Sequence, residues 1–317
     1  MSRTAHEAPI DASVLVPFTI FTIVWSSTWI VIRDQLGVVA PQWSVAYRFL
    51  LAAAGMAVVA KLQGHSLRPT RALLIPAAVI GLSQFSMNFN SVYLAERFIT
   101  SGVVATVFAL LLIPNSLMAW AFLGQKPNRR FFIAALVAAS GIALLFVHEL
   151  RAAPPADTRG VLTGLFFTFT GLMGASIANV YQAGERSKAH PLPVLLTWSM
   201  ALGAAVDVVL ALGVAGAPTF DPRPGYWLGL LYLALAASVL CFSLYFPVVR
   251  KIGPGRAAYS SVIVPFIAMT LSTLFEGYRW NPVAIAGGVL AIGGMMLALG
   301  GRRKKGEPEL VAGPDAA

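Results

Sequence analysis

The chain has 317 residues, of which 57% are hydrophobic and 11% are charged, and its net charge is +10. Because a soluble domain carries about 25% charged residues, this composition excludes a soluble globular protein. Apolar runs of about 20 residues recur along the chain and predict an all-α polytopic membrane protein. The positive charges are spread through short loops, as membrane topology requires. We therefore expect the lipid bilayer, and no nucleic acid, as a partner.

The scarcity of cysteine and histidine argues against metal sites. Cys241 is the single cysteine, and the four histidines fall in the N-terminal tail or between apolar runs. One chain can therefore build neither a disulfide framework nor a thiolate-rich metal site, and we expect no metal and no cofactor. The first apolar run, residues 14–32, has no small-residue cleavage site behind it, so it should remain as the first span.

Proline, glycine and charged clusters divide the chain into ten expected transmembrane helices. The expected spans are residues 14–32, 43–61, 72–95, 101–123, 131–148, 160–182, 192–215, 226–249, 256–275 and 282–300. The loops between them are short, so no soluble domain is inserted.

Lysines and arginines divide unequally between the two sides that these spans define. With the N-terminus inside, 16 lie on the cytoplasmic side, 6 lie outside and Arg48 lies within a span. This bias predicts that both termini are cytoplasmic. Residues 1–13 then form a cytoplasmic tail, residues 149–159 a periplasmic linker, and residues 301–317 a basic and then flexible cytoplasmic tail.

Matching residues that recur about 150 positions apart indicate an internal duplication. Pro114 and Pro265 lie 151 residues apart, each ten residues before a turn, and Pro41 and Pro191 lie 150 apart. Each unit would hold five spans, an odd number, so the second unit (160–300) enters the membrane from the opposite face to the first (14–148). Inverted repeats are the usual way in which transporters build two access states around one site.

Polar side chains interrupt the third expected span. At 100° per residue, Gln84, Asn88 and Ser91 fall on one helical face. Polar groups in a span are costly unless they face the bundle interior or water, so this face predicts a substrate-binding cavity. The alternative is that the amides hold neighbouring helices together.

Three further residues extend this candidate binding set. Trp25 in the first span and Asn179 in its repeat mate would meet near the midplane, and Tyr259 precedes Pro265 in the ninth span. The aromatic rings of Trp25 and Tyr259 could stack on a planar substrate. Packing between helices is the alternative for both rings.

Two charged residues lie within expected spans. Arg48 is a candidate partner for a substrate carboxylate, because its planar group of donors suits that anion. It lies near the outer boundary, so the alternative is that its long side chain reaches that surface. Asp207 could carry a proton or pair internally.

Matched prolines and small residues suggest moving and fixed parts of the bundle. Pro114 and Pro265 each delete a helical hydrogen bond, so the fourth and ninth spans should kink there, as a pair of hinges or as static kinks. Small residues in the fifth and tenth spans should allow close helix packing, as a scaffold or as a dimer face. They are Ala134, Ala138, Gly141, Gly287, Gly288, Gly293 and Gly294.

Three features carry a resemblance to a known family: ten spans in two units, the run Tyr-Arg-Phe-Leu-Leu-Ala-Ala (47–53), and the two prolines. In these features the chain resembles the EamA-type branch of the drug/metabolite transporter superfamily, over residues 14 to 300. Within that branch the chain is most similar to bacterial exporters of aromatic amino acids and other small metabolites. The resemblance implies an inner-membrane secondary transporter that exports such metabolites by alternating access. The family often has Gly-Glu after the fourth span, whereas Gln125 follows Gly124 here.

Two other function classes compete with an exporter. A uniporter or channel-like facilitator for other small metabolites or drugs is the first alternative. An intramembrane enzyme is disfavoured, because no histidine lies in the interior of a span and neither His-Glu-x-x-His, Gly-x-Gly-Asp nor clustered acids occur. We therefore expect a monomeric carrier that is not an enzyme.

Overall fold

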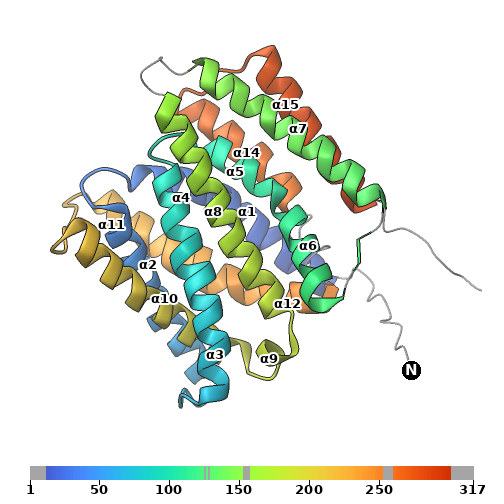
Figure 1. Cartoon of the computed structure of the whole chain (residues 1–317). Helices are drawn as coiled ribbons and strands as arrows, with labels where there is room; N and C mark the ends of the chain where they lie inside the picture. Colours follow the sequence, from blue (N-terminus) through green and yellow to red (C-terminus); the bar gives the residue numbers. More distant parts are fainter. Residues whose placement is uncertain (1–11, 125, 128, 153–157, 253–259, 301–317) are drawn as a thin grey trace, which may run out of the picture.

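The computed structural model describes residues 12–124, 126–127, 129–152, 158–252 and 260–300. These residues are all-helical and contain no strand (Figure 1). The helices are α1 (Ala12–Asp34), α2 (Pro41–Leu62), α3 (Arg71–Ile80), η1 (Gly81–Asn88), α4 (Phe89–Ala95), α5 (Ser101–Phe108), η2 (Ala109–Leu111), α6 (Leu112–Leu123), α7 (Arg129–Ala152), α8 (Thr158–Gln182), α9 (Glu185–Lys188), α10 (Leu192–Ala215), α11 (Pro224–Leu231), η4 (Tyr232–Leu240), α12 (Cys241–Ile252), α14 (Ser260–Phe275) and α15 (Pro282–Gly300).

Each expected span overlaps one helix or one continuous run of helices, with boundaries that agree within a few residues. Seven of these runs are long and apolar enough to cross a membrane, and Ile263–Phe275 and Pro282–Gly294 are shorter apolar helices. The polytopic helical fold is therefore confirmed, whereas the count of ten spans and the side of each terminus stay predictions.

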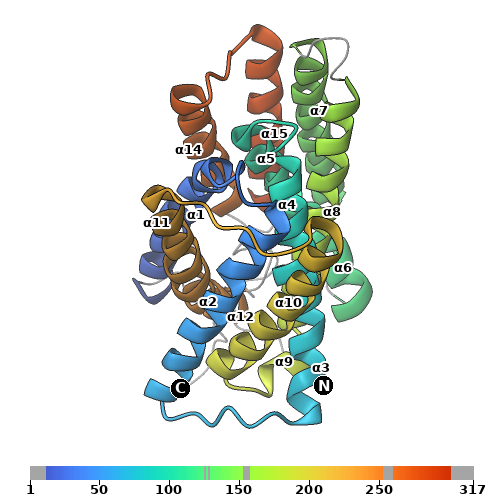
Figure 2. The same ribbon diagram turned by 90° about the vertical axis from the view of Figure 1, so that its left-hand side faces the viewer.

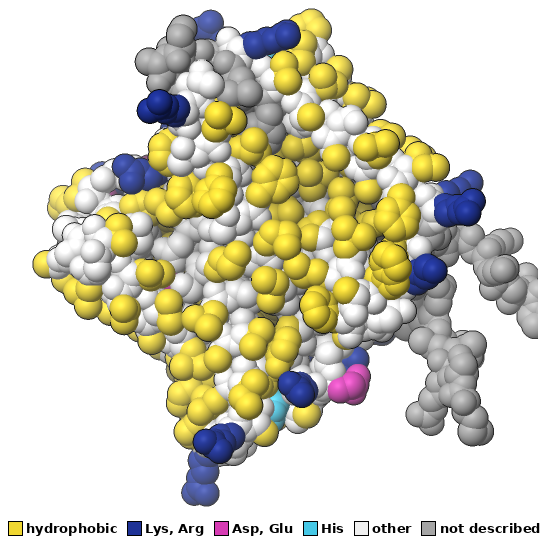
Figure 3. Space-filling view, viewed as in Figure 1, with side chains coloured by type: hydrophobic (Ala, Val, Ile, Leu, Met, Phe, Trp, Pro, Cys, Tyr) yellow, Lys and Arg dark blue, Asp and Glu magenta, His cyan; other side chains and the backbone are white. Residues whose placement is uncertain are grey.

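The surface suits a lipid environment. On the face shown in Figure 3, hydrophobic side chains cover the middle, and lysines and arginines gather at its edges. Large apolar side chains such as Leu136 and Phe166 are mostly exposed. Lipid tails solvate such groups without cost, and the helices satisfy their own backbone hydrogen bonds.

Two π-helical segments interrupt long α-helices at matching places. η1 and η4 start 151 residues apart, at Gly81 and Tyr232, which is also the spacing of Pro114 and Pro265. η1 lies directly on the backbone of α10, where a Cβ on Gly81 would be 2.5 Å from the Ser199 carbonyl oxygen. The sequence pattern predicts a uniform α-helix for the third span, so it does not predict this change of helix type.

The helical run 101–123 also changes type, directly before Pro114. η2 is a short 3₁₀ segment, and Pro114 is the third residue of α6. Proline lacks a backbone donor and its ring clashes with the carbonyl four residues earlier, which here belongs to Leu110 in η2. Pro265 lies inside α14, which remains α-helical around it.

The buried side chains form two main clusters. The larger cluster includes residues of α1, α2, η1, α10 and α12, and the second includes residues of α5, α7, α14 and α15. Trp29 and Phe108 pack against both clusters, and their ring centroids are 5.3 Å apart. Trp29 and Phe108 also line a cavity at this junction.

α7 and α15 lie side by side along one edge of the molecule in both ribbon views (Figures 1 and 2). Their backbones meet through five of the seven small residues that the sequence singled out, whereas Gly288 and Gly293 lie away from the crossing. A Cβ on Gly141 would collide with the backbone of Gly287 and Ala291, and one on Gly294 would collide with that of Ala134 and Ala138. These residues therefore fix one helix against the other within the chain.

Gly141→Ala should lower the thermal unfolding temperature of the detergent-solubilised protein. Its new methyl group meets α15 backbone atoms, which cannot move aside, and overpacking of this kind costs about 1–3 kcal/mol. Gly288→Ala is the matched control, because a Cβ there meets nothing within 4 Å. An equal melting temperature in Gly141→Ala and the control would contradict the tight crossing.

Candidate functional site

A cavity of about 140 Å³ lies between the two buried clusters. Its wall combines amides and one guanidinium group with aromatic rings, and it draws on α1, α2, η1, α4, α5, α8, α12 and α14, among others. The lining residues are Trp25, Thr28, Trp29, Ile32, Arg48, Gln84, Asn88, Phe89, Val92, Ala105, Phe108, Ala109, Leu111, Ala175, Asn179, Phe242, Tyr245, Ser260 and Val264.

Five of the candidate residues from the sequence come together in this wall: Trp25, Arg48, Gln84, Asn88 and Asn179. Residues from four separate helical runs thus converge on one cavity. Tyr259 lies outside the described residues, although its neighbour Ser260 lines the cavity.

Ser91 and Asp207 are buried away from the cavity wall. Ser91 was placed on the face of Gln84 and Asn88 by assuming an α-helix. A π-helix turns through a smaller angle per residue, because its hydrogen bonds span five residues instead of four. Over η1 the face rotates, so Phe89 and Val92 line the cavity where Ser91 was expected.

Arg48 does not reach the outer surface. It is 1% exposed, and its Nε donates to Ser238 Oγ in η4 over 3.2 Å. The guanidinium carbon lies 4.3 Å from the centre of the Phe89 ring, a cation–π contact. No ion pair among the described residues includes Arg48, so its charge lacks a carboxylate partner there.

Trp25 presents its ring rather than its donor to the cavity. The indole Nε1 donates to the Ala237 carbonyl of η4 over 2.9 Å. Its ring packs edge-on against Phe242 and Tyr245, with centroids 5.4 and 4.9 Å away. Packing and cavity lining, which were alternatives on sequence grounds, therefore occur together.

Three buried polar atoms of the wall have no hydrogen-bond partner among the described residues: Trp29 Nε1, Arg48 Nη1 and Asn88 Oδ1. Two are donors and one is an acceptor. A buried polar group without a partner costs free energy, so a ligand that pairs with these atoms would stabilise the site. The arrangement suits a small molecule that carries both an anionic and a donor group.

Asp207 pairs internally. Asn90 Nδ2 donates to Asp207 Oδ1 over 2.7 Å and to the Ser86 carbonyl over 3.0 Å. This contact joins α10 to the helix that carries Gln84 and Asn88. Asp207 therefore belongs to the support of the cavity wall and not to its surface.

Several aromatic residues of the wall were missed on sequence grounds: Trp29, Phe108, Phe242 and Tyr245. Trp29 lies four residues after Trp25, and Tyr245 three after Phe242, so each pair shares a helical face. That spacing was a usable signal, although apolar faces in a membrane protein are equally typical of contact with lipid.

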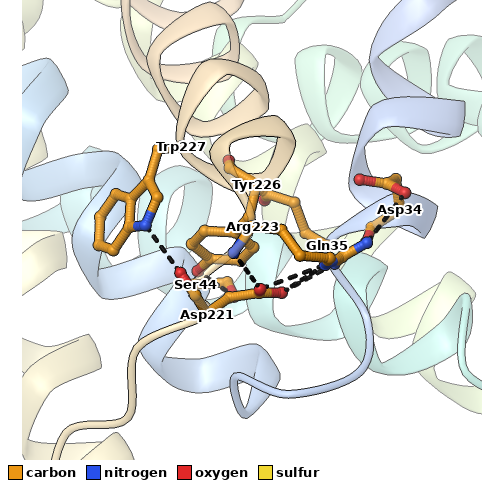
Figure 4. A network of polar contacts seen from close by, with 7 residues as sticks. All are labelled: Asp34, Gln35, Ser44, Asp221, Arg223, Tyr226 and Trp227. Carbon is orange, nitrogen blue, oxygen red and sulfur yellow. Dashed lines mark hydrogen bonds and ion pairs between the residues drawn. The ribbon is translucent and has the colours of Figure 1, made fainter.

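A polar network braces the ends of α1, α2 and α11 (Figure 4). Arg223 donates to the Asp221 carboxylate through Nε and Nη2, at 2.9 and 2.8 Å, and its Nη2 also donates to the Asp34 carbonyl. The hydrogen bonds from Arg223 hold the pKa of Asp221 below its usual value. Ser44 and Tyr226 share a hydroxyl–hydroxyl bond of 2.9 Å beside this pair. The brace lies outside the cavity.

Comparisons with known proteins agree with this architecture. A relative from Escherichia coli strain K12, named "Uncharacterized inner membrane transporter YedA", is 27% identical over 281 residues, which cover 88% of this chain and 88% of the relative. A protein of Streptantibioticus cattleyicolor, named "Probable terminal-alkyne amino-acid exporter", is 25% identical over 298 residues, covering 90% and 94%.

A solved crystal structure superposes with a TM-score of 0.66 at 18% sequence identity, covering 90% of this chain and 96% of that one. At this identity the likeness shows the fold. The model of the EamA-like transporter family matches residues 14–147 and 162–300. Because these ranges make up most of the sequence, the chain belongs to the EamA-like transporter family of the drug/metabolite transporter superfamily and is a membrane transporter.

Proposed function

We propose that this transporter exports small polar metabolites, amino acids including aromatic ones, across the cytoplasmic membrane by alternating access. The observation that carries the proposal is Arg48, a buried guanidinium group in the cavity wall without an ion-pair partner among the described residues. A buried charge is costly unless it is paired, and a substrate carboxylate is the partner that suits it.

The remaining unpartnered atoms fit the rest of an amino acid. Trp29 Nε1 could donate to the same carboxylate as Arg48 Nη1, and Asn88 Oδ1 could accept from the substrate ammonium group. Trp25 and Phe108 offer ring faces and edges for an aromatic or apolar side chain. The exporter named for amino acids among the relatives supports the same substrate class.

The size of the cavity favours small metabolites over drugs. Its volume of about 140 Å³ is below the roughly 300 Å³ at which pockets for drug-sized ligands begin. Export of larger drugs through a channel-like route, the alternative kept from the sequence, would need a wider site than this conformation offers.

Matching features in the two halves support inverted repeats. η1 and η4 start 151 residues apart, as do Pro114 and Pro265. The family model matches residues 14–147 and 162–300, close to the expected repeats of residues 14–148 and 160–300. With an odd number of spans in each, the two halves face opposite sides and both termini are cytoplasmic, as the charge bias predicts.

The two prolines are well placed to act as hinges. Leu111 and Val264, which line the cavity, lie close before Pro114 and Pro265 in sequence. A change of bend at either proline would therefore move the cavity wall. The missing hydrogen bond lowers the cost of such bending.

Purified protein in liposomes should catalyse saturable counterflow of a labelled aromatic amino acid. Asn88→Ala should weaken substrate affinity about ten- to a hundredfold, because a hydrogen bond to a charged group contributes about 1.5–3 kcal/mol. Ser91→Ala is the matched control, because this buried residue of α4 lies off the cavity wall. Unsaturable flux without counterflow would indicate a channel instead, and equal affinities in both variants would remove Asn88 from the site.

Reporter fusions should place the two turns that follow the proline helices on opposite faces. Alkaline phosphatase, which is active only outside the cytoplasm, should be active when fused at Arg279 and inactive when fused at Pro127. Activity at both positions, or at neither, would contradict inverted halves.

Pro114→Ala and Pro265→Ala should slow transport more than they weaken binding. The restored backbone hydrogen bond stabilises the helix against bending by about 0.5–1.5 kcal/mol. If bending limits transport, this corresponds to a transport rate that is up to about tenfold lower. Transport rate and substrate affinity are measured on the same liposomes. Pro76→Ala in α3, away from the cavity, is the control, and a loss of affinity that matches the loss of rate would argue against hinging.

A further inference from the structure

A second buried polar site lies in the turn between α4 and α5. Glu96 follows Ala95, the last residue of the third apolar span, and is 0% exposed. Both of its carboxylate oxygens are buried and lack a hydrogen-bond partner within the part of the chain that the structure describes. A charged carboxylate in this position loses its hydration without compensation, so the protonated form is favoured.

Four charged or titratable groups act on Glu96: Glu276, Arg33, Arg48 and Tyr93. Burial is the main reason that the pKa of Glu96 lies well above its usual range, and the negative charge of Glu276 raises it further. Arg33 and Arg48 oppose this rise, but no ion pair in the described part of the chain includes Glu96. Burial and the charge of Glu276 therefore favour the protonated form of Glu96, and the two arginines favour the charged form.

Glu276 is at the same time the centre of a contact between three helix ends, which we call the outer latch. Its carboxylate accepts from the backbone N–H and the hydroxyl of Ser101, at 3.3 and 2.7 Å, and lies 3.6 Å from Arg33 Nε. Arg33 is in the last turn of α1, Ser101 begins α5, and Glu276 directly follows α14. The latch thus joins the first expected repeat to the second.

The latch substitutes for a missing helix cap. Thr100 is the N-cap residue of α5, but its side chain makes no capping bond. Glu276 supplies the anionic acceptor from the other half of the molecule, where it also meets the positive end of the α5 dipole. Beside it, α5 and α14 approach closely at Gly102, where a Cβ would lie 2.8 Å from Ser272 Cβ.

We propose that Glu96 is a proton-binding site that controls the outer latch. With a proton bound, Glu96 is neutral and the charged Glu276 stays on Ser101 and Arg33. When Glu96 loses its proton, two carboxylates repel each other in a water-poor interior, and the repulsion is relieved when α14 moves away from α5 and water enters. Proton loss therefore opens the outer end of the cavity; the use of this step in transport rests on the carrier function proposed above.

The opening can be followed by pulsed electron paramagnetic resonance between spin labels at Val38→Cys and Arg279→Cys. Both sites are exposed, and the buried Cys241 is replaced by serine. In lipid nanodiscs without substrate, the longer distance should gain population by about tenfold per pH unit on the acid side of the transition, since one proton separates the two states.

Glu96→Gln, which mimics the protonated acid, should keep the short distance from pH 5 to 9. Glu276→Gln should populate the longer distance even at acid pH, because it weakens the contact with Arg33 and Ser101. Glu185→Gln, a matched substitution in the exposed helix α9, should keep the wild-type profile.

The proposal would be overturned if the spin-label distance in the wild-type protein did not change with pH. It would also be overturned if Glu96→Gln showed the same dependence of this distance on pH as the wild-type protein. If Glu96→Gln does not fold, Glu276→Gln decides, because an unchanged profile in that variant would equally overturn it. The distance measurement needs no substrate. A pH-dependent latch without counterflow would thus refute only the carrier function, and counterflow with a pH-independent latch would refute only the proton site.

Discussion

The unpaired charge of Arg48 is the constraint around which the cavity is built. A guanidinium group inside a membrane bundle needs partners from several helices at once, because lipid supplies none. Its stem comes from α2, its hydrogen bond from Ser238 in η4, and its cation–π contact from Phe89 in α4. These contacts leave Nη1 unpaired, so the same residue that ties the helices together provides the strongest attraction for an anionic ligand.

Helix positions followed from the sequence because the length of an apolar run sets the length of a span. Five candidate residues from the sequence also lie in the cavity wall, because a polar side chain within a span must face the bundle interior or water. The predicted position of Ser91 was wrong because helix register depends on packing. Gly81 crosses α10 closely at the start of a π-helix, and the local sequence pattern does not predict that helix type. Glu96 was overlooked because it lies one residue beyond an apolar run, where a charged side chain normally meets water.

The two halves resemble each other in backbone more than in charge. Both carry a π-helix and a proline helix at the same offset, which gives them similar ways to bend. Glu276, however, matches Gln125 in the first half. A neutral amide cannot form an ion pair or repel a second carboxylate. An acidic latch can therefore control only one end of the cavity, and the two ranges that match the family model can respond differently to pH.

Arg48 couples the cavity and the outer latch electrostatically. Its positive charge lowers the proton affinity of Glu96, although the two side chains form no ion pair. A substrate carboxylate bound to Arg48 would cancel part of that charge and tighten the hold of Glu96 on its proton. By thermodynamic reciprocity, protonation of Glu96 would strengthen the binding of the carboxylate to the same degree. A filled cavity would thus favour a closed outer latch until the ligand or the proton leaves, without any direct contact between substrate and latch.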